Sequence, residues 1–253
     1  MAGDHTRFRA RTIRASTLEV LTSAVRGAPP AGRAAEWDEL VDAGIASDAG
    51  ELRPRWRDLL AEAASAPIAF RVHSRTGRAG MHSAISLSPR VGLSITERRR
   101  LTVTDAEVVV DAVEDAVEIA LFEPKAIWPA VQRVLPPSRL TRAEGGANPR
   151  EERTIGILRD VPERSALPDG VLADLAGADV EVNLALQVDN GTPTPFVTAR
   201  HWLEGADDRL LEVRLEGDAL TVVRVPAGSI ADEVVWLGVG ALDLRSRTQP
   251  TAS

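Results

Sequence analysis

The hydrophobic positions follow a helical period at the start of the chain and a strand period after it. Apolar residues recur every three or four positions over residues 16–26, 33–43 and 54–64, which predicts three amphipathic helices. From residue 67 the period changes to two, which predicts extended strands. We expect these strands at residues 67–73, 80–88, 91–98, 101–113 and 116–122, followed by a helix at 123–135. Alternation within residues 1–14 predicts a short edge strand ahead of the helices.

A similar order returns after a break in the pattern. Residues 136–153 are rich in proline, glycine and charge, and Leu140 is their only large aliphatic residue, so we expect a flexible linker there. Beyond this linker the pattern predicts a helix, four strands and a final helix. They are expected at residues 168–177, 180–189, 195–204, 209–216, 219–225 and 229–242.

These two parts of the chain align as an internal repeat. Three apolar positions of the first terminal helix fall on three of the second without a gap: Ile127 on Ile230, Val131 on Val234 and Val134 on Leu237. We therefore predict an α+β fold with a central, mostly antiparallel sheet and helices packed on one face. It is built from two pseudo-two-fold related helix–β-meander–helix halves, residues 1–135 and 154–242, within a single domain spanning 1–253.

Composition narrows the functional classes. The chain has no cysteine, which excludes disulfides, zinc–thiolate sites, iron–sulfur clusters and a cysteine nucleophile. A formal net charge of −7 argues against nucleic acid as the partner, because phosphate binding needs a basic surface. No apolar run approaches the roughly 20 residues of a membrane helix, and residues 1–14 do not read as a secretory signal. A cytoplasmic protein with no membrane partner is expected.

No motif in the sequence selects a catalytic site. Phosphate-loop, dinucleotide-binding, zinc-protease and serine-hydrolase patterns are all missing from the sequence. His73 and His201 lie on predicted strands and could act as general bases, but no neighbouring motif supplies a partner. The acidic residues between 105 and 118 alternate with valine and alanine, which is typical of a solvated sheet face rather than a metal site. We predict no catalytic residue, no cofactor and no metal.

Two features suggest contact with another protein. Residues 74–80 form a glycine-containing loop between two strands, with Arg75 and Arg78 exposed, and such loops often carry recognition. Arg98–Arg100 predicts a charged hairpin end. Trp202 on a strand and Trp236 late in the last helix are candidate interface anchors, because tryptophan is enriched at interfaces.

The order of elements resembles the EspG family of cytosolic chaperones of type VII (ESX) secretion. The resemblance covers most of the chain and includes the phrase LVDAGIASDAGELRPRWRDLLAEAASAPIAFRV at 40–72 and a helix ending in LPP at 135–137. The short, arginine-rich N-terminus departs from the family pattern. The resemblance implies a mixed α+β fold with a central sheet that binds the apolar tip of a helical substrate of PE–PPE type.

The same resemblance implies where the contact lies. In that family the loop between the second and third strands and the C-terminal helical region touch the substrate. Carried over, the contact residues are Arg75, Thr76, Gly77 and Arg78 in the loop and Ile230, Val234 and Leu237 in the last helix. The chain itself is expected to be a monomer or a weak dimer.

Two other functions stay open from the sequence. The three N-terminal helices with the turn at Asp48–Gly50 mimic a winged-helix DNA-binding regulator, although the acidic net charge counts against it. An enzyme with an uncharacterised site would need a concave polar pocket near His73 or His201, with a carboxylate within hydrogen-bond reach.

Overall fold

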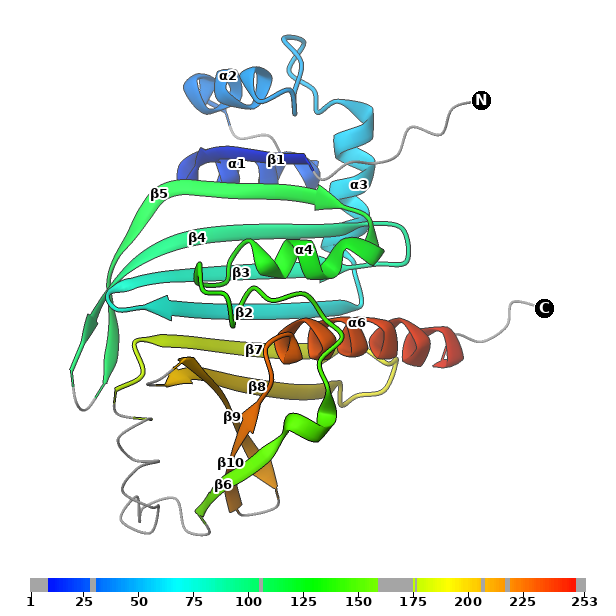
Figure 1. Ribbon diagram of the computed structural model, residues 1–253. Helices are drawn as coiled ribbons and strands as arrows, with labels where there is room; N and C mark the ends of the chain where they lie inside the picture. Colours follow the sequence, from blue (N-terminus) through cyan, green and yellow to red (C-terminus); the bar gives the residue numbers. More distant parts are fainter. Residues whose placement is uncertain are drawn as a thin grey trace.

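A single antiparallel sheet of ten strands forms the centre of the computed structural model (Figure 1). The structure describes residues 9–27, 31–104, 107–158, 175, 177–205, 208–216 and 219–248. The strand order is β1-β5-β4-β3-β2-β7-β8-β9-β10-β6, and every neighbouring pair is antiparallel. The predicted α+β class is confirmed.

Elements of the first half lie close to their predicted positions. They are β1 (Arg9–Arg14), α1 (Ala15–Val25), α2 (Ala34–Asp42), α3 (Pro54–Ala64), β2 (Ile68–Thr76), β3 (Ala79–Leu87), β4 (Gly92–Val103), β5 (Val108–Phe122), the 3-10 helix η1 (Pro124–Ala126) and α4 (Ile127–Gln132). One prediction was wrong: three strands were expected between residues 91 and 122, and there are two long ones. The arginines at 98–100 are paired within β4, and the turn lies after Thr104, whose N–H donates to Glu107 O.

Elements of the second half repeat this order. They are the 3-10 helix η2 (Pro149–Glu151), β6 (Arg153–Leu158), β7 (Val180–Val188), β8 (Phe196–Gly205), β9 (Arg209–Glu216), β10 (Ala219–Val225) and α6 (Ser229–Thr248). The sequence pattern missed β6, and the helix expected at 168–177 lies outside the described residues except for positions 175 and 177.

The two halves meet at the pairing of β2 with β7. From this pair outward, strands β2, β3, β4, β5 and β1 on one side match β7, β8, β9, β10 and β6 on the other. The matching order relates the halves by an approximate two-fold axis that passes between β2 and β7. Each half ends in a helix, α4 or α6, and these two helices contact each other across the centre of the sheet (Figure 1).

Helices α4 and α6 cover one face of the central strands. Alternate residues of β2 and β7 point to this face, such as Phe70 and Leu184, and they are buried against Val131 and Val234 of the helices. This alternation follows from the period of two in a strand. We call this side the helical face, and the opposite side of the central strands β3, β2, β7 and β8 the open face.

Helices α1, α2 and α3 do not share the helical face, so the expectation of helices on one face was wrong in this respect. They pack on the opposite side of the sheet, near the β1 edge, where Leu40, Trp56 and Leu60 bury Ile119 and Leu121 of β5. At its end β5 is apolar on both sides, because Ala120 and Phe122 face the other way and are buried as well. A continuous apolar run of this kind is typical of a strand covered on both faces.

The connection at 136–153, expected to be a flexible linker, is packed and hydrogen-bonded in the structure. Thr141 is buried, and Leu140 packs against the core beneath α4 and α6. The two carboxylate oxygens of Asp232 in α6 accept hydrogen bonds from the backbone N–H groups of Gly146 and Ala147, each with an N···O distance of 2.7 Å. This loop is therefore held through hydrogen bonds that its own backbone N–H groups donate to a distant carboxylate. Its composition, rich in glycine and proline, does not reveal such bonds.

Candidate functional site

The predicted contact loop between β2 and β3 is a tight hairpin rather than a long loop. β2 extends to Thr76 and β3 begins at Ala79, so only Gly77 and Arg78 form the turn. Gly77 has a positive φ of 53°, which glycine adopts without steric cost, and its N–H donates to Asp179 O over 2.9 Å. The hairpin tip is thus fixed in place, and the side chains of Thr76 and Arg78 are exposed.

Arg75, the first residue of the predicted contact set, already has partners within the chain. Its Nε donates to Glu181 Oε2 over 3.1 Å, and its Nη2 lies 3.3 Å from Ala178 O. Its side chain is only 15% exposed. Thr76 and Arg78 therefore remain available to a partner, whereas Arg75 mainly connects β2 to β7.

The predicted contact residues of α6 point into the core, so this assignment was wrong. Ile230, Val234 and Leu237 are at most 3% exposed and pack in the core cluster on the helical face. They recur at i, i+4 and i+7, and this spacing marks the side of an amphipathic helix that its own protein buries. Trp202, the other tryptophan considered as an anchor, is also buried.

The solvent side of α6 carries a different apolar set. Val235, Trp236 and Val239 are 43%, 65% and 62% exposed, and Phe196 at the start of β8 is 46% exposed. Trp236 and Phe196 line one groove of about 160 Å³ between α6 and β8, whose floor includes Gly240. We call this the α6 groove.

Packing against the described residues does not require a glycine at position 240. A Cβ built there would meet no atom within 4 Å among the described residues. A glycine inside a helix costs about 1 kcal/mol relative to alanine. Glycine at this position therefore lowers the stability of α6 and leaves open space at the groove. Gly238, two residues earlier in α6, differs from Gly240, because a Cβ built at Gly238 would touch Ile127 of α4.

A chain of ion pairs lies in a neighbouring cavity that shares Trp236 with the α6 groove. Arg200 Nε lies 2.6 Å from Glu233 Oε1, and Arg214 bonds to the buried Glu212 over 2.8 Å. Together with Trp236 these side chains line a second, more polar cavity. The surface beside α6 therefore combines an exposed aromatic anchor, an apolar groove and a polar rim, which is the usual anatomy of a protein interface.

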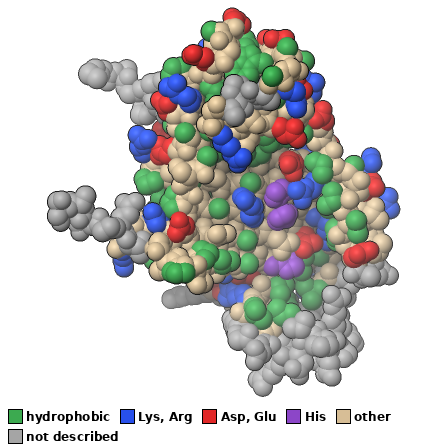
Figure 2. Space-filling model, turned by 180° about the vertical axis from the view of Figure 1, so that it is seen from behind, with side chains coloured by type: hydrophobic (Ala, Val, Ile, Leu, Met, Phe, Trp, Pro, Cys, Tyr) green, Lys and Arg blue, Asp and Glu red, His purple; other side chains and the backbone are tan. Residues whose placement is uncertain are grey.

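The open face carries the histidines of the described chain (Figure 2). His73 of β2 and His82 of β3 are register partners, and their rings stack with centroids 4.4 Å apart. Arg99 Nη2 lies 2.8 Å from His82 Nδ1 and 3.0 Å from Glu97 Oε2. His201 of β8 lies 3.1 Å from a carboxylate oxygen of Glu181.

These contacts set the charge states on the open face. Burial, then the neighbouring His82 and the guanidinium groups of Arg99 and Arg71, lower the pKa of His73. Burial and Arg99 also lower the pKa of His82, so both rings are neutral at pH 7. Contact with His201, and then hydrogen bonds from Asn183 and Arg75, hold the pKa of Glu181 at about 2.

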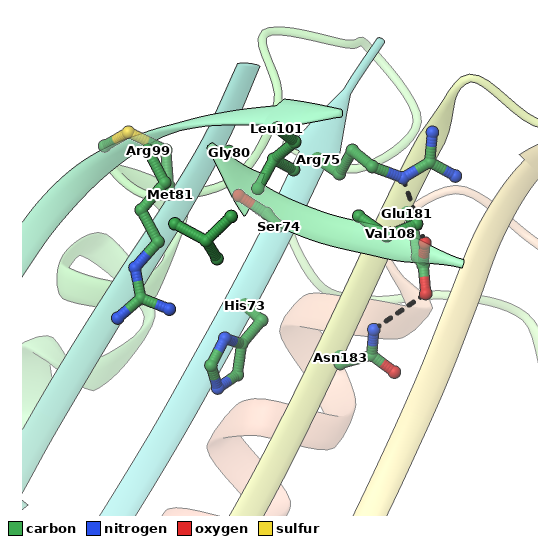
Figure 3. Close-up of a pocket in the computed structure, with 11 residues that line it drawn as sticks. His73, Ser74, Arg75, Gly80, Met81, Arg99, Leu101, Val108, Glu181 and Asn183 are labelled. Atoms are coloured by element: carbon green, nitrogen blue, oxygen red, sulfur yellow. Dashed lines mark hydrogen bonds and ion pairs between the residues drawn. The ribbon is translucent and has the colours of Figure 1, made fainter. Parts of the chain in front are cut away.

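A cavity of about 330 Å³ lies at one end of the open face (Figure 3). His73, Arg99 and Glu181 form part of its polar side. Leu101, Val108 and Val110 contribute apolar side chains from the β4–β5 hairpin. The cavity has the size of a small ligand pocket and is lined by both polar and apolar side chains.

Catalytic chemistry finds limited support in this cavity. A carboxylate does lie beside a histidine, as the enzyme hypothesis requires, but Glu181 also accepts hydrogen bonds from Arg75 and Asn183. No serine or threonine hydroxyl of the described residues hydrogen-bonds to a histidine, and Ser74 instead donates to Val134 O beneath α4. Within the described ranges no group of three metal-ligating side chains could hold an ion.

Sequence reasoning missed several residues of these surfaces. Trp236 was considered as an anchor, but Phe196 and Gly240 were not, because their adjacency arises only when α6 packs on the sheet. Arg71 was missed as well, since it alternates with apolar residues in a way typical of any half-buried strand.

Comparison with known proteins assigns no family to the chain: no protein-family model matches it, and no curated protein matches it. In the part of the chain that the structure describes, no helix has both the length and the apolar character needed to cross a membrane.

Proposed function

We propose that the protein is a non-enzymatic, chaperone-like binding protein of the cytoplasm that recognises a helical secretion substrate of PE–PPE type of a type VII secretion system. It would act as a monomer or weak dimer and mask the exposed apolar end of its substrate. The resemblance of the chain to the EspG family motivates this choice of substrate.

The observation that carries the proposal is the exposed Trp236 beside the open groove at Gly240. A tryptophan that is 65% exposed next to a second exposed aromatic, Phe196, is typical of an interface anchor. A glycine on the groove floor lets the backbone of a partner helix approach closely, because interhelical distance depends on the side chains at the contact. The exposed side chains of Thr76 and Arg78 on the β2–β3 hairpin offer a second contact.

The proposal is tested by co-expressing the tagged chain with a PE–PPE pair from the same genome and measuring complex formation by size-exclusion chromatography. A complex of equal stoichiometry supports the proposal. We expect Trp236→Ala to weaken it about tenfold or more. Val197→Ala is the matched control, since Val197 is 61% exposed on β8 and points to the opposite face.

Two results would count against the proposal in different ways. If none of the PE–PPE pairs of the genome binds the chain, the substrate class is wrong. If a complex forms but Trp236→Ala and Val197→Ala both leave its affinity unchanged, the α6 groove is not the contact surface.

An enzyme remains the second candidate, because a carboxylate does contact a histidine near a concave pocket. It predicts that His201→Asn, in the folded protein, abolishes turnover of a small molecule while leaving substrate-protein binding intact. The DNA-binding alternative has less support, since α3 buries Trp56 and Leu60 against the sheet.

A further inference from the structure

The β4–β5 hairpin bends over the open face instead of continuing the plane of the sheet. β4 and β5 span 12 and 15 residues, whereas the neighbouring β3 spans 9. Their register shifts twice, between Glu97 and Arg99 and between Arg100 and Leu101, and such bulges bend a strand pair. After the second shift Leu101 lies on Gly80, where a Cβ would come within 2.9 Å of Leu101 Cδ1.

The hairpin presents an apolar wall to the groove beneath it. Val108 and Val110 line the cavity on the open face and are 48% and 45% exposed. Figure 3 shows Val108 on this hairpin. Val103, Val109 and Val113 of the same hairpin are 37% to 53% exposed. Exposed aliphatic side chains concentrated on one protruding element mark an interaction surface more often than isolated ones do.

The open face carries an exposed arginine, Arg71, two positions along β2 from His73 of the cavity. Arg71 projects from β2 between Ala84 and Ala185, its register partners on β3 and β7, so no large side chain flanks it on those strands. No carboxylate among the described residues forms an ion pair with Arg71, whereas Arg75 and Arg99 are paired with Glu181 and Glu97. Counting only the described residues, Arg71 therefore adds a positive charge to the open face beside the cavity.

The backbone at this place favours a helix as the occupant. β2 is hydrogen-bonded to β3 on one side and to β7 on the other, so this part of the sheet offers no free backbone groups to an added strand. An extended peptide lying on a sheet face would leave its own N–H and C=O groups unpaired, whereas a helix satisfies them internally.

We propose that the groove between the β4–β5 hairpin and the open face is a docking site for an amphipathic helix of a partner protein. Its aliphatic face packs on Val108 and Val110, and its acidic face lies over Arg71. This site is on the opposite side of the sheet from the α6 groove and does not depend on the function proposed above.

The test uses a fluorescent synthetic helix of about 18 residues, or five turns, with leucine on one face and glutamate on the other. A twin peptide carries lysine in place of each glutamate. Fluorescence anisotropy should show binding of the acidic peptide that weakens with salt and little binding of the basic twin. Equal binding of both peptides would overturn the proposal.

Variants then locate the site. Arg71→Glu and Val110→Ser should each lower the affinity for the acidic peptide about tenfold, and both positions are exposed, so circular dichroism should show an intact fold. Arg224→Glu is the control, because Arg224 is an exposed strand arginine on β10. Unchanged affinity in Arg71→Glu, or a loss caused instead by Trp236→Ala, would refute the assignment to the open face.

Discussion

Gly92→Ala and Gly240→Ala introduce the same methyl group into two surroundings that the structure makes opposite. Gly92 begins β4 as the register partner of Phe122, and a Cβ there would overlap the Phe122 ring. That ring is fully buried in the core with Trp128 and Ile127, so it has no solvent side toward which to move. Overpacking of this kind costs about 1–3 kcal/mol.

Gly240 gives the reverse expectation. It lies inside α6 with no described atom near the added methyl group, so alanine relieves the helix cost of glycine and stabilises the protein by about 1 kcal/mol at most. The same methyl group fills part of the α6 groove. We therefore expect Gly240→Ala to be more stable than the wild type and to bind a helical partner less tightly.

Urea unfolding followed by circular dichroism measures both changes on one scale, with the slope m checked for constancy. The midpoint should fall for Gly92→Ala and rise for Gly240→Ala. If Gly92→Ala is neutral, the Phe122 ring does not occupy the position that the structure gives it. If Gly240→Ala is destabilising, the groove floor is not open, and the argument that Gly240 is kept for a partner is refuted.

Four further substitutions, with one control, test the packing and electrostatics. Leu237→Ala should cost about 2–5 kcal/mol, and Trp236→Ala should change the unfolding midpoint little; similar losses in both would mean that α6 is rotated. Glu181→Gln should remove up to about 3 kcal/mol of stability at neutral pH. The folded pKa of Glu181, about 2, lies below its ordinary value of 4.5. That stability is therefore present above about pH 4.5 and is lost as the pH falls toward 2, so unfolding midpoints of the variant across this range should be flatter than those of the wild type. Asp232→Ala should increase hydrogen exchange at residues 143–149, with Asp243→Ala as the control, and unchanged exchange would show that Asp232 does not hold this segment.

The sequence predicted most of the elements because their periodicity reflects burial on one side. Ile68, Phe70 and Val72 alternate in the sequence and are all buried on the helical face. The apolar spacing of Ile127 and Val131 correctly predicts α4, although Pro129 lies between them. This proline falls in the first turn of the helix, where its missing N–H costs no helical hydrogen bond.

The failures arose where long-range contacts decide the structure. Arg98–Arg100 was interpreted as a hairpin end, but two neighbouring strands pair with this part of β4, which local charge cannot indicate. The segment 136–153 has Leu140 as its only large aliphatic residue, yet a distant carboxylate, Asp232, holds its backbone. The contact surface of α6 was assigned to its regular apolar stripe, Ile230, Val234 and Leu237, which is buried. The residues of α6 that are exposed to a partner lie outside that stripe, such as Trp236.

The differences between the two halves coincide with the two proposed surfaces. If a duplicated half-unit only built the sheet, its matching elements would have similar lengths. α4 has 6 residues and its counterpart α6 has 20, while β4 and β5 have 12 and 15 against 8 and 7 for β9 and β10. The extra length of α6 carries Trp236 and Gly240, and the extra length of the hairpin carries the exposed valines. Because the shorter counterparts show that the sheet can be built without these extensions, we infer that the extensions serve binding.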